Sequence, residues 1–533
     1  MVNMDNDLTY QWATVVLLFV VLCFILFTYQ DFGITWDEYV QHQYGQYIID
    51  YYATLGQDKS ALSYKNLYLY GGFFDSIAVI LTKTIPADIY HTRHLFNAIV
   101  GFIGLIGTLK LANLLGGART AFLAVLLLAL EPFYLGNMFN NPKDIPFATA
   151  YVWSLYYMLS AFRYFPFIPT KLKIKLGIAI GLALSIRIGG ILLYSYLILA
   201  VLLYVFRPSA IVAKNPNKVV LKKWRWHLLN SLFLIFVISQ AIMLVFWPWA
   251  QQAPLTRPFQ ALSAMSQFAW QGSVLYQGQH ISAQNLPGSY LIQHFIIKLS
   301  ETINLSIIAG SVLLLWLIAK KRFKPIPTTL SLFVFVVIAS VFPILYASIS
   351  NATLYDTIRH FLFIIPLLCV LSAIIIDKLI GMHKYARKYP ATSFFTIALL
   401  LVTPQLYALS ELHPYEYVYY NTFVGGLNGA SGRYETDYWA SSYKESVEVL
   451  VAYLKQKDGN KFEKHQYKIH VCTPAFPAKH YFPKNFKLEK KLDKADYYIS
   501  STRWNCHKKG NGTKVGAVTR AAVDLSIIKA IIP

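Results

Sequence analysis

Three short polar motifs carry the residue types from which a catalytic site can be built. They are "TWDE" at 35–38, "NNPKD" at 140–144 and "YDTIRH" at 355–360, and each adjoins an apolar run. A carboxylate in such a place can take a proton from an attacking hydroxyl, and a cation can stabilise negative charge on a departing group. The motifs therefore hold the groups that a displacement reaction at a lipid surface needs.

Each motif also has a structural explanation. Thr35 and Glu38 fit a capping box at the start of a helix, where Asp37 would lie near the positive end of the helix dipole. Asn141 would cap a second helix whose first turn contains Asp144. The Arg-His pair of the third motif fits a snorkelling position at the end of a span. These explanations account for single motifs but not for their concentration on one side.

The elements that position these motifs are membrane spans. Hydrophobic residues make up 56% of the 533 residues and charged residues only 14%, a composition typical of an integral membrane protein. Apolar runs of the roughly 20 residues that cross a bilayer recur up to about residue 410. We predict a polytopic α-helical membrane protein with about eleven spans, near residues 12–28, 95–113, 120–137, 146–162, 172–186, 189–206, 228–247, 303–319, 328–347, 361–377 and 391–409.

The distribution of Lys and Arg predicts the orientation. Five connections together hold 20 Lys and Arg: 110–119, 163–175, 207–227, 320–324 and 378–389. The segments on the other side of the membrane hold only 9. Basic loops stay in the cytoplasm, so the N-terminus is predicted to be cytoplasmic. The transmembrane domain, residues 1–411, then has outer loops at 29–94, 138–146, 248–300 and 348–360.

The last fifth of the chain has the composition of a soluble domain. From residue 412 to 533 it alternates short apolar runs with polar turns, and it holds 19 Lys and Arg against 11 Asp and Glu. We predict a small outer α/β domain, whose lysines either solubilise it or attract anionic head groups or a lipid phosphate. The expected elements are a helix at 441–456 and strands at 467–472, 496–502 and 516–528.

The four cysteines divide into two groups. Cys23 and Cys369 fall in predicted spans and suit small apolar core positions. Cys472 and Cys506 lie near strand ends in the outer domain, where an oxidising compartment would allow a disulfide between them. Zinc is disfavoured, because neither cysteine belongs to a CxxC pair. Basic and aromatic residues do not interleave as in nucleic-acid binding, so that class is set aside.

Glycosyl transfer from a polyprenyl-phosphate sugar fits acids and cations at one membrane surface. The leaving group is a phosphate and needs only a cation, whereas the attacking hydroxyl needs a base. A single base opposite the leaving group gives inversion. The alternatives are a lipid or polysaccharide transporter, which would carry ionisable groups near mid-span, and a transferase of a whole lipid-linked oligosaccharide. Since Arg187 is placed at an outer turn, an enzyme should tolerate Arg187→Gln better than Asp37→Asn.

The Asp-Glu pair, "FNNPKDIPFA" and "YDTIRHFLF" together resemble the GT-C superfamily of membrane glycosyltransferases, specifically bacterial relatives of protein O-mannosyltransferases and aminoarabinose transferases. The resemblance implies a multi-pass protein of the bacterial inner membrane, with its active site and C-terminal domain in the periplasm. It implies a polyprenyl-phosphate sugar donor and an acceptor that is a glycan, a lipid or a protein. Metal use varies in the superfamily, so a divalent metal stays open and no cofactor is assigned.

The resemblance also implies roles for single residues. Asp37 would be the catalytic base, with Glu38 beside it as an orienting, acceptor-binding or metal-contacting acid. Asp144 would be a second acid of the same cavity. The donor phosphate would meet Arg359, Lys143 and His360. Polar and aromatic residues of the outer segments are further candidates for substrate contacts: Arg93, His94, Trp247, Trp249, Tyr290, Tyr355, His413 and Tyr415.

Overall fold

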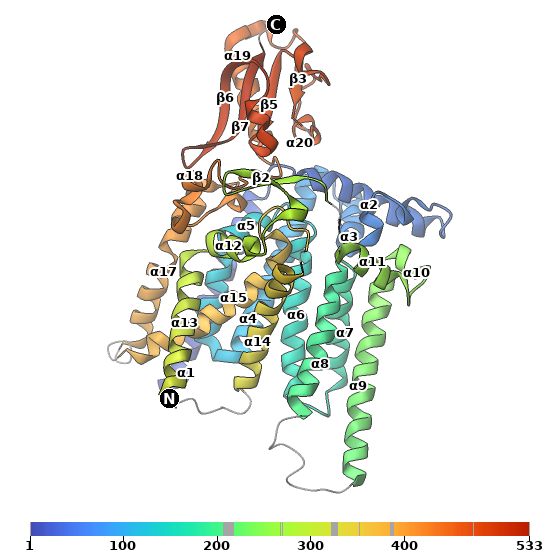
Figure 1. Ribbon diagram of the computed structural model, residues 1–533, viewed down its shortest axis with the longest axis vertical. Helices are drawn as coiled ribbons and strands as arrows, with labels where there is room; N and C mark the ends of the chain where they lie inside the picture. The colour runs from blue at the N-terminus through green and yellow to red at the C-terminus, as the bar shows by residue number, and fades with distance from the viewer. Residues whose placement is uncertain are drawn as a thin grey trace.

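The computed structural model describes residues 2–205, 218–266, 268, 270–320, 329–350, 352–383, 389–472 and 474–531. Figure 1 shows a bundle of long helices with a small sheet domain standing on one end, and the N-terminus at the opposite end. The basic connections 207–227, 320–324 and 378–389 lie partly outside the described residues, and so does the predicted span 189–206.

Within the described residues, each segment predicted as a span overlaps at least one helix, although several of the predicted bounds differ from those of the helices. The bundle comprises α1 (Val2–Thr28), α4 (Ile89–Ala129), α6 (Asp144–Phe162), α7 (Thr170–Leu184), α8 (Leu192–Val205), α9 (Lys218–Val245), α13 (Glu301–Ala319), α14 (Thr329–Ile349), α15 (Ile365–Met382) and α17 (Pro390–Leu412). Helix α4 contains two predicted spans, because Gly117 with φ of 82° breaks it into two helices. The second of these ends at Ala129 rather than at 137, and α5 (Pro132–Asn137) begins at a proline.

Six helices in the described part of the chain are long and apolar enough to cross a membrane: Asp7–Thr28, Ile89–Ala129, Arg225–Val245, Ser331–Ile349, Arg359–Met382 and Pro390–Leu412. A seventh is added if Ser289–Lys298 and Glu301–Trp316, which are bent by 115°, form one broken span. The chain is therefore mostly helical with at least six candidate spans. The count of eleven stays a prediction.

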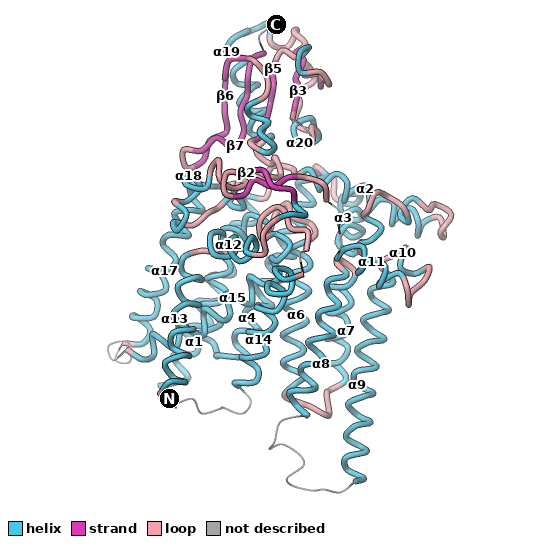
Figure 2. Tube along the Cα trace, in the orientation of Figure 1, coloured by secondary structure: helices cyan, strands magenta, loops and turns pink. Residues whose placement is uncertain are grey.

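Shorter elements cover the end of the bundle that carries the sheet domain (Figure 1). The first outer loop contains α2 (Trp36–Ala53), η1 (Ser60–Leu62), η2 (Leu67–Leu69) and α3 (Phe73–Thr84). The later segments contain η3 (Ile188–Ile191), α10 (Pro248–Gln251), α11 (Arg257–Ser266), β1 (Ser273–Tyr276), β2 (Gln279–Ser282), η4 (Ala283–Asn285), α12 (Ser289–Lys298) and η5 (Arg359–Ile364). In Figure 2 the strands are confined to the sheet domain and to the β1–β2 hairpin beneath it.

The segment between α17 and the sheet belongs to the core of the helical part. It contains η6 (Glu416–Val418), η7 (Thr422–Val424) and α18 (Gly426–Ala430), and its tyrosines pack with the bundle. The core of the sheet domain begins at Ala440 and includes the apolar face of α19 (Tyr443–Asp458). The segment 413–439 thus joins the two parts by packing rather than as a free linker.

The sheet domain has a mixed five-stranded sheet in the order β4-β3-β5-β7-β6. Strand β3 pairs in parallel with β4 and β5, whereas β7 pairs antiparallel with β5 and β6. The strands are β3 (Tyr467–Val471), β4 (Phe486–Leu488), β5 (Tyr497–Ser501), β6 (Gly512–Arg520) and β7 (Val523–Ile531). The connections include η8 (Gly459–Lys461), α20 (Phe476–Lys479), η9 (Leu492–Lys494) and η10 (Arg503–Lys508).

The single strand predicted at 516–528 is wrong, because this segment is a hairpin. Strand β6 ends at Arg520 and β7 begins at Val523. Ala521 and Ala522 between them have φ of 45° and 61°. Two-residue hairpin turns with positive φ at both positions usually contain Asn or Gly. An Ala-Ala pair carries no such signal, so these residues do not indicate the turn.

Candidate functional site

A cavity of about 340 Å³ lies where the helical part meets the sheet domain. It draws on the first outer loop, the start of α6, the turn before η3, Phe268 and Trp270, the segment at 355–360, and the C-terminal domain. Its lining residues are Trp36, Asp37, Val40, Lys65, Asn66, Leu67, Tyr70, Lys143, Arg187, Phe268, Trp270, Tyr355, Asp356, Arg359, His360, Pro474, Arg503 and Trp504.

Cations outnumber acids in this lining. Two aspartates face five cationic side chains, which are Lys65, Lys143, Arg187, Arg359 and Arg503. Within the described part of the chain, no carboxylate oxygen lies within 4.0 Å of either lysine ammonium. The cavity therefore has a positive charge excess that suits an anionic group such as a phosphate.

Alternating charges connect α2 to the C-terminal domain through this cavity. Arg359 Nη1 lies 3.1 Å from Asp37 Oδ2, and its Nη2 lies 2.9 Å from Asp356 Oδ2. The other oxygen of Asp356 lies 2.6 Å from Arg503 Nη1. The side chain of Asp37 is 29% exposed, whereas those of the other three residues are at most 7% exposed. Asp37 is therefore the most exposed of these four charged residues and the one that a ligand can reach.

The charge state of Asp37 follows from these neighbours. Burial alone would raise the pKa of Asp37, but the charges of Arg359 and Lys143, with the hydrogen bond from Arg359, hold the pKa below its usual value. Asp37 is consequently ionised at neutral pH. An ionised carboxylate that opens on a cationic cavity can accept a proton from a bound hydroxyl.

Glu38 takes no part in the cavity lining. The Thr35 N–H donates to its carboxylate at 2.8 Å, and the His94 ring Nε2 lies 3.0 Å from it, so that the side chain is 1% exposed. Consecutive helical residues point about 100° apart, which separates Asp37 from Glu38. The Asp-Glu pair is thus divided between an acid in the cavity and an acid that holds the start of α2.

The motif at 140–144 is divided in the same way. Lys143 lines the cavity with its Nζ 4.5 Å from the Tyr70 ring centre. Asp144 is 2% exposed and forms an ion pair with Arg187, so it reaches the cavity only through that arginine. The Asn141 side chain accepts the Asp144 N–H at 3.0 Å, but Lys143 occupies the N-cap position of α6, so the predicted cap at Asn141 is wrong. Arg187 lines the cavity. Arg187→Gln is therefore unsuitable as the control variant for Asp37→Asn, because it also changes the charge of the site.

The other residues predicted to contact the donor or the acceptor fall into two groups, those that line the cavity and those that do not. Tyr355 and His360 line the cavity, and the Tyr355 ring stacks on Trp270 with 4.5 Å between centroids. The others do not line it and make protein contacts instead: Arg93 with Asp75, His94 with Glu38, Trp247 with the Tyr68 carbonyl, Trp249 with the Arg257 guanidinium, Tyr290 with the Thr357 N–H, His413 with Asp31 and Glu416, and Tyr415 with Glu445.

Tyr290 does not line the cavity but stabilises the backbone next to Asp356, which does. Asp356 and Thr357 have φ of 55° and 63°, which is uncommon for a β-branched residue such as threonine. The Thr357 N–H donates to the Tyr290 hydroxyl at 3.1 Å, and the Tyr290 ring is fully buried. This contact stabilises the backbone conformation that presents Asp356 to the two arginines.

Several cavity residues were not predicted as site residues from the sequence. Trp36 and Asp356 lie inside motifs that had been singled out for other residues, whereas Arg503 and Trp504 come from the C-terminal domain. The Trp36 and Trp504 rings are stacked with 5.7 Å between centroids and 14° between planes. Arg503 and Trp504 lie in "STRWNC" at 501–506, where the sequence predicts a role only for Cys506, so no signal linked this segment to the membrane part.

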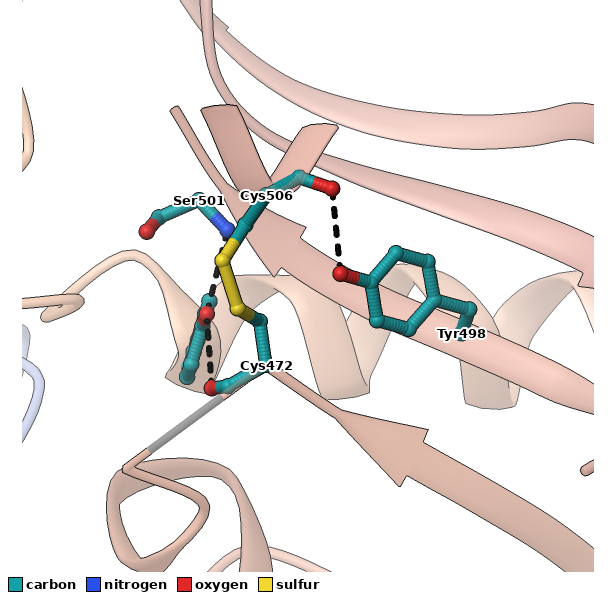
Figure 3. The surroundings of a disulfide bond; sticks show 5 residues. Cys472, Tyr498, Ser501 and Cys506 are labelled. Carbon is teal, nitrogen blue, oxygen red and sulfur yellow. Dashed lines mark hydrogen bonds between the residues drawn. A yellow bond between two sulfur atoms is a disulfide. The ribbon is translucent and has the colours of Figure 1, made fainter. Parts of the chain in front are cut away.

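A disulfide joins Cys472 and Cys506, whose Cα atoms are 6.2 Å apart (Figure 3). The Tyr498 hydroxyl donates to the Cys506 carbonyl at 3.0 Å. The bond connects the residue after β3 to η10, which carries Arg503 and Trp504. It therefore restrains the part of the C-terminal domain that contributes to the cavity.

The described residues contain no group of three or more His, Cys, Asp or Glu that could hold a metal ion. The two acids of the cavity, Asp37 and Asp356, both pair with Arg359. This donor set does not fit a metal centre, and no step is assigned to one.

No protein-family model and no curated protein matches the chain. Among solved structures, the oligosaccharyltransferase of Archaeoglobus fulgidus in its apo form matches with a TM-score of 0.51 and 12% identity, over 88% of this chain. The chain spans 63% of the length of that protein. At this identity the match shows the fold alone.

Two further structures match with lower scores. ArnT from Cupriavidus metallidurans, bound to undecaprenyl phosphate, has a TM-score of 0.47 and 14% identity over 97% of both chains. Arabinofuranosyltransferase AftD from Mycobacteria has a TM-score of 0.42 and 12% identity over 98% of this chain and 41% of its own. The match to the oligosaccharyltransferase supports, for the fold alone, the resemblance to the GT-C superfamily seen in the sequence.

Proposed function

We propose that this protein is an inverting glycosyltransferase that moves one sugar from a polyprenyl-phosphate carrier to an acceptor at the periplasmic face of the bacterial inner membrane. The observation that carries the proposal is the position of Asp37. Its carboxylate opens on a cavity with excess cations and lies 3.1 Å from Arg359, so a base and a phosphate-binding group are adjacent.

The donor phosphate belongs at the cationic side of the cavity. Lys143 and Arg359 both approach Asp37 closely enough to lower its pKa, so a phosphate between them would lie beside the base. The Arg187 guanidinium completes this side, and its Nε is buried with no hydrogen-bond partner in the described structure. Unpartnered buried donors are costly, and a phosphate oxygen would satisfy them.

The proposed reaction follows from these positions. Asp37 takes the proton of the acceptor hydroxyl as its oxygen attacks the anomeric carbon of the donor sugar. The bond from that carbon to the phosphate oxygen breaks, and the phosphate leaves with the electron pair. Arg359 and Lys143 stabilise the charge that develops on it. Attack opposite the leaving group inverts the anomeric configuration.

Donor binding also strengthens the base in this scheme. Arg359 and Lys143 lower the pKa of Asp37 when the phosphate is absent. A phosphate that pairs with both cations weakens their effect on Asp37, and the pKa of this carboxylate rises toward the value at which proton transfer is efficient. The base would therefore become more effective once the donor is in place.

The aromatic side of the cavity suits sugar rings. The stacked pair of Trp36 and Trp504 and the stacked pair of Trp270 and Tyr355 all line the cavity. Their flat apolar faces can cover the apolar face of a sugar. A volume of about 340 Å³ is at the low end of the range for ligand pockets, which favours transfer of one sugar over transfer of an oligosaccharide.

The test uses the full chain in lipid nanodiscs with radiolabelled polyprenyl-phosphate sugars. The expected result is donor cleavage with release of the polyprenyl phosphate, and a transferred sugar of inverted configuration. Asp50→Asn is a matched control, because Asp50 lies on the same helix and is bonded to Gln46. Movement of labelled lipid across proteoliposomes without cleavage of any donor would favour the transporter and contradict the proposal.

A further inference from the structure

The sheet domain contributes one charged side chain to the centre of the site. We propose that Arg503 is a positioning residue, which neutralises Asp356 and thereby leaves Arg359 available to Asp37 and to the donor phosphate. This inference rests on the proposed function. It assigns the C-terminal domain a part in donor binding in addition to any role in covering the cavity.

Arg503 is buried and forms a direct ion pair with Asp356, and the charge of the buried Glu435 also acts on it. Its side chain is 2% exposed, and Nη1 lies 2.6 Å from Asp356 Oδ1 and 2.9 Å from the Tyr438 carbonyl oxygen. The guanidinium carbon lies 4.8 Å from the Trp36 ring centre and 5.0 Å from that of Trp504. An arginine held between aromatic rings keeps a fixed orientation, which a lysine would not share.

Asp356 is shared between two arginines. One oxygen accepts from Arg503, and the other lies 2.9 Å from Arg359 Nη2. Because Asp356 is only 2% exposed, its charge must be balanced by protein groups. Without Arg503, both oxygens of Asp356 would turn to Arg359. The guanidinium would then be drawn away from Asp37, and the attraction of Arg359 for a phosphate would fall.

Both ends of this ion pair lie on unusual backbone that the fold holds in place. Trp504 and Asn505, next to Arg503, have φ of 53° and 56°, and the disulfide of Cys506 follows directly. The Asp356 end is held by the contact between Thr357 and Tyr290 described above. Left-handed conformations in non-glycine residues are uncommon and occur often at functional sites.

The domain offers a matched control in Arg520. This arginine pairs with Glu445 of α19 within the sheet domain at 2.7 Å, and it bridges to the helical part by donating to the His413 carbonyl at 2.9 Å. It does not belong to the cavity lining. A change at Arg520 therefore reports on domain contacts without touching the charges of the site.

The experiment measures binding of undecaprenyl phosphate to the full chain in nanodiscs. Arg503→Gln should weaken binding about tenfold, since one charge-assisted contact to the phosphate is lost. The double variant Arg503→Gln with Asp356→Asn should restore binding to within about threefold of the wild type, because the competing charge is gone. Arg520→Gln should bind as the wild type does, and Arg503→Lys should fall between wild type and Arg503→Gln.

Two outcomes in the variants overturn the inference while leaving the proposed function intact. Unchanged binding in Arg503→Gln would show that Arg503 does not control Arg359. Equal weakness of the single and double variants would show that Arg503 only holds the domain. Arg503→Lys, which keeps the charge, provides the comparison if Arg503→Gln does not fold. If the wild type binds no undecaprenyl phosphate, the proposed function fails and the inference fails with it, which distinguishes this case from the other two.

Discussion

Two clusters of ion pairs tie together distant segments of this chain, and they differ in how completely their charges are matched. Arg119 on α4 pairs with Asp377 on α15, and Asp377 also accepts the Thr120 hydroxyl at 3.1 Å. One cation there meets one acid. The cavity lining has two acids and five cations, of which Arg187 also pairs with Asp144 outside the lining, and it opens on a space of about 340 Å³.

The difference separates a structural contact from a site that is ready for a ligand. In the first cluster, the donors and acceptors largely satisfy one another. In the second, the Nε atoms of Arg187, Arg359 and Arg503 are buried and have no hydrogen-bond partner in the described structure. Such groups are rare in folded proteins unless water or a ligand satisfies them. The excess of cations in the lining, more than the presence of ion pairs, is the feature on which the proposed binding of an anionic ligand rests.

Among variants of the two clusters, Arg359→Gln is expected to cause the largest loss of donor binding and sugar transfer. The variant loses the group that meets both Asp37 and the proposed phosphate, so undecaprenyl phosphate binding and sugar transfer should each fall about 10²-fold. Arg119→Gln should lower the midpoint of thermal unfolding but leave donor binding unchanged. Equal losses of donor binding in Arg359→Gln and Arg119→Gln would contradict the view that only the cavity residues bind the donor.

A smaller effect is expected from Lys143→Gln. The Lys143 ammonium lies over the Tyr70 ring and forms no ion pair within 4.0 Å in the described part of the chain, so its removal costs one charge contact to the phosphate and leaves no acid without its direct partner. Donor affinity should fall about tenfold at low salt and less at high salt, because screening weakens the contact. Lys171→Gln, at the exposed start of α7, is the matched control. A loss of affinity that does not change with salt would argue against a phosphate contact.

The smallest effect is a shift in the acid limb of the pH profile. Asp37 must be ionised to act as a base, and its pKa lies below the usual value of about 3.9. The kcat/KM of the wild type should therefore persist as the pH falls, with its acid limb below about pH 4. In Lys143→Gln the limb should move to higher pH, because one of the cations that lower this pKa is gone. A limb that Lys143→Gln does not move would contradict the assignment.

The sequence predicted the helical segments and several residues of the cavity for the same reason. Apolar runs define the spans, and polar residues at the ends of spans stand out against them, as Lys143, Tyr355 and Arg359 do. It could not separate Asp37 from Glu38, because adjacent letters do not show which side chain faces a cavity and which one caps a helix. Arg503 was missed because its contact with Asp356 spans 147 residues of chain.

The central claim is that Asp37 is the catalytic base, and the adjacent acid provides its internal control. Sugar transfer and donor binding would be measured for the wild type, Asp37→Asn and Glu38→Gln in the same lipid. The account predicts that Asp37→Asn binds the donor but loses transfer by about 10²-fold or more, whereas Glu38→Gln, which can still accept the Thr35 N–H, loses less than about tenfold. Transfer by Asp37→Asn at the rate of the wild type would contradict the account.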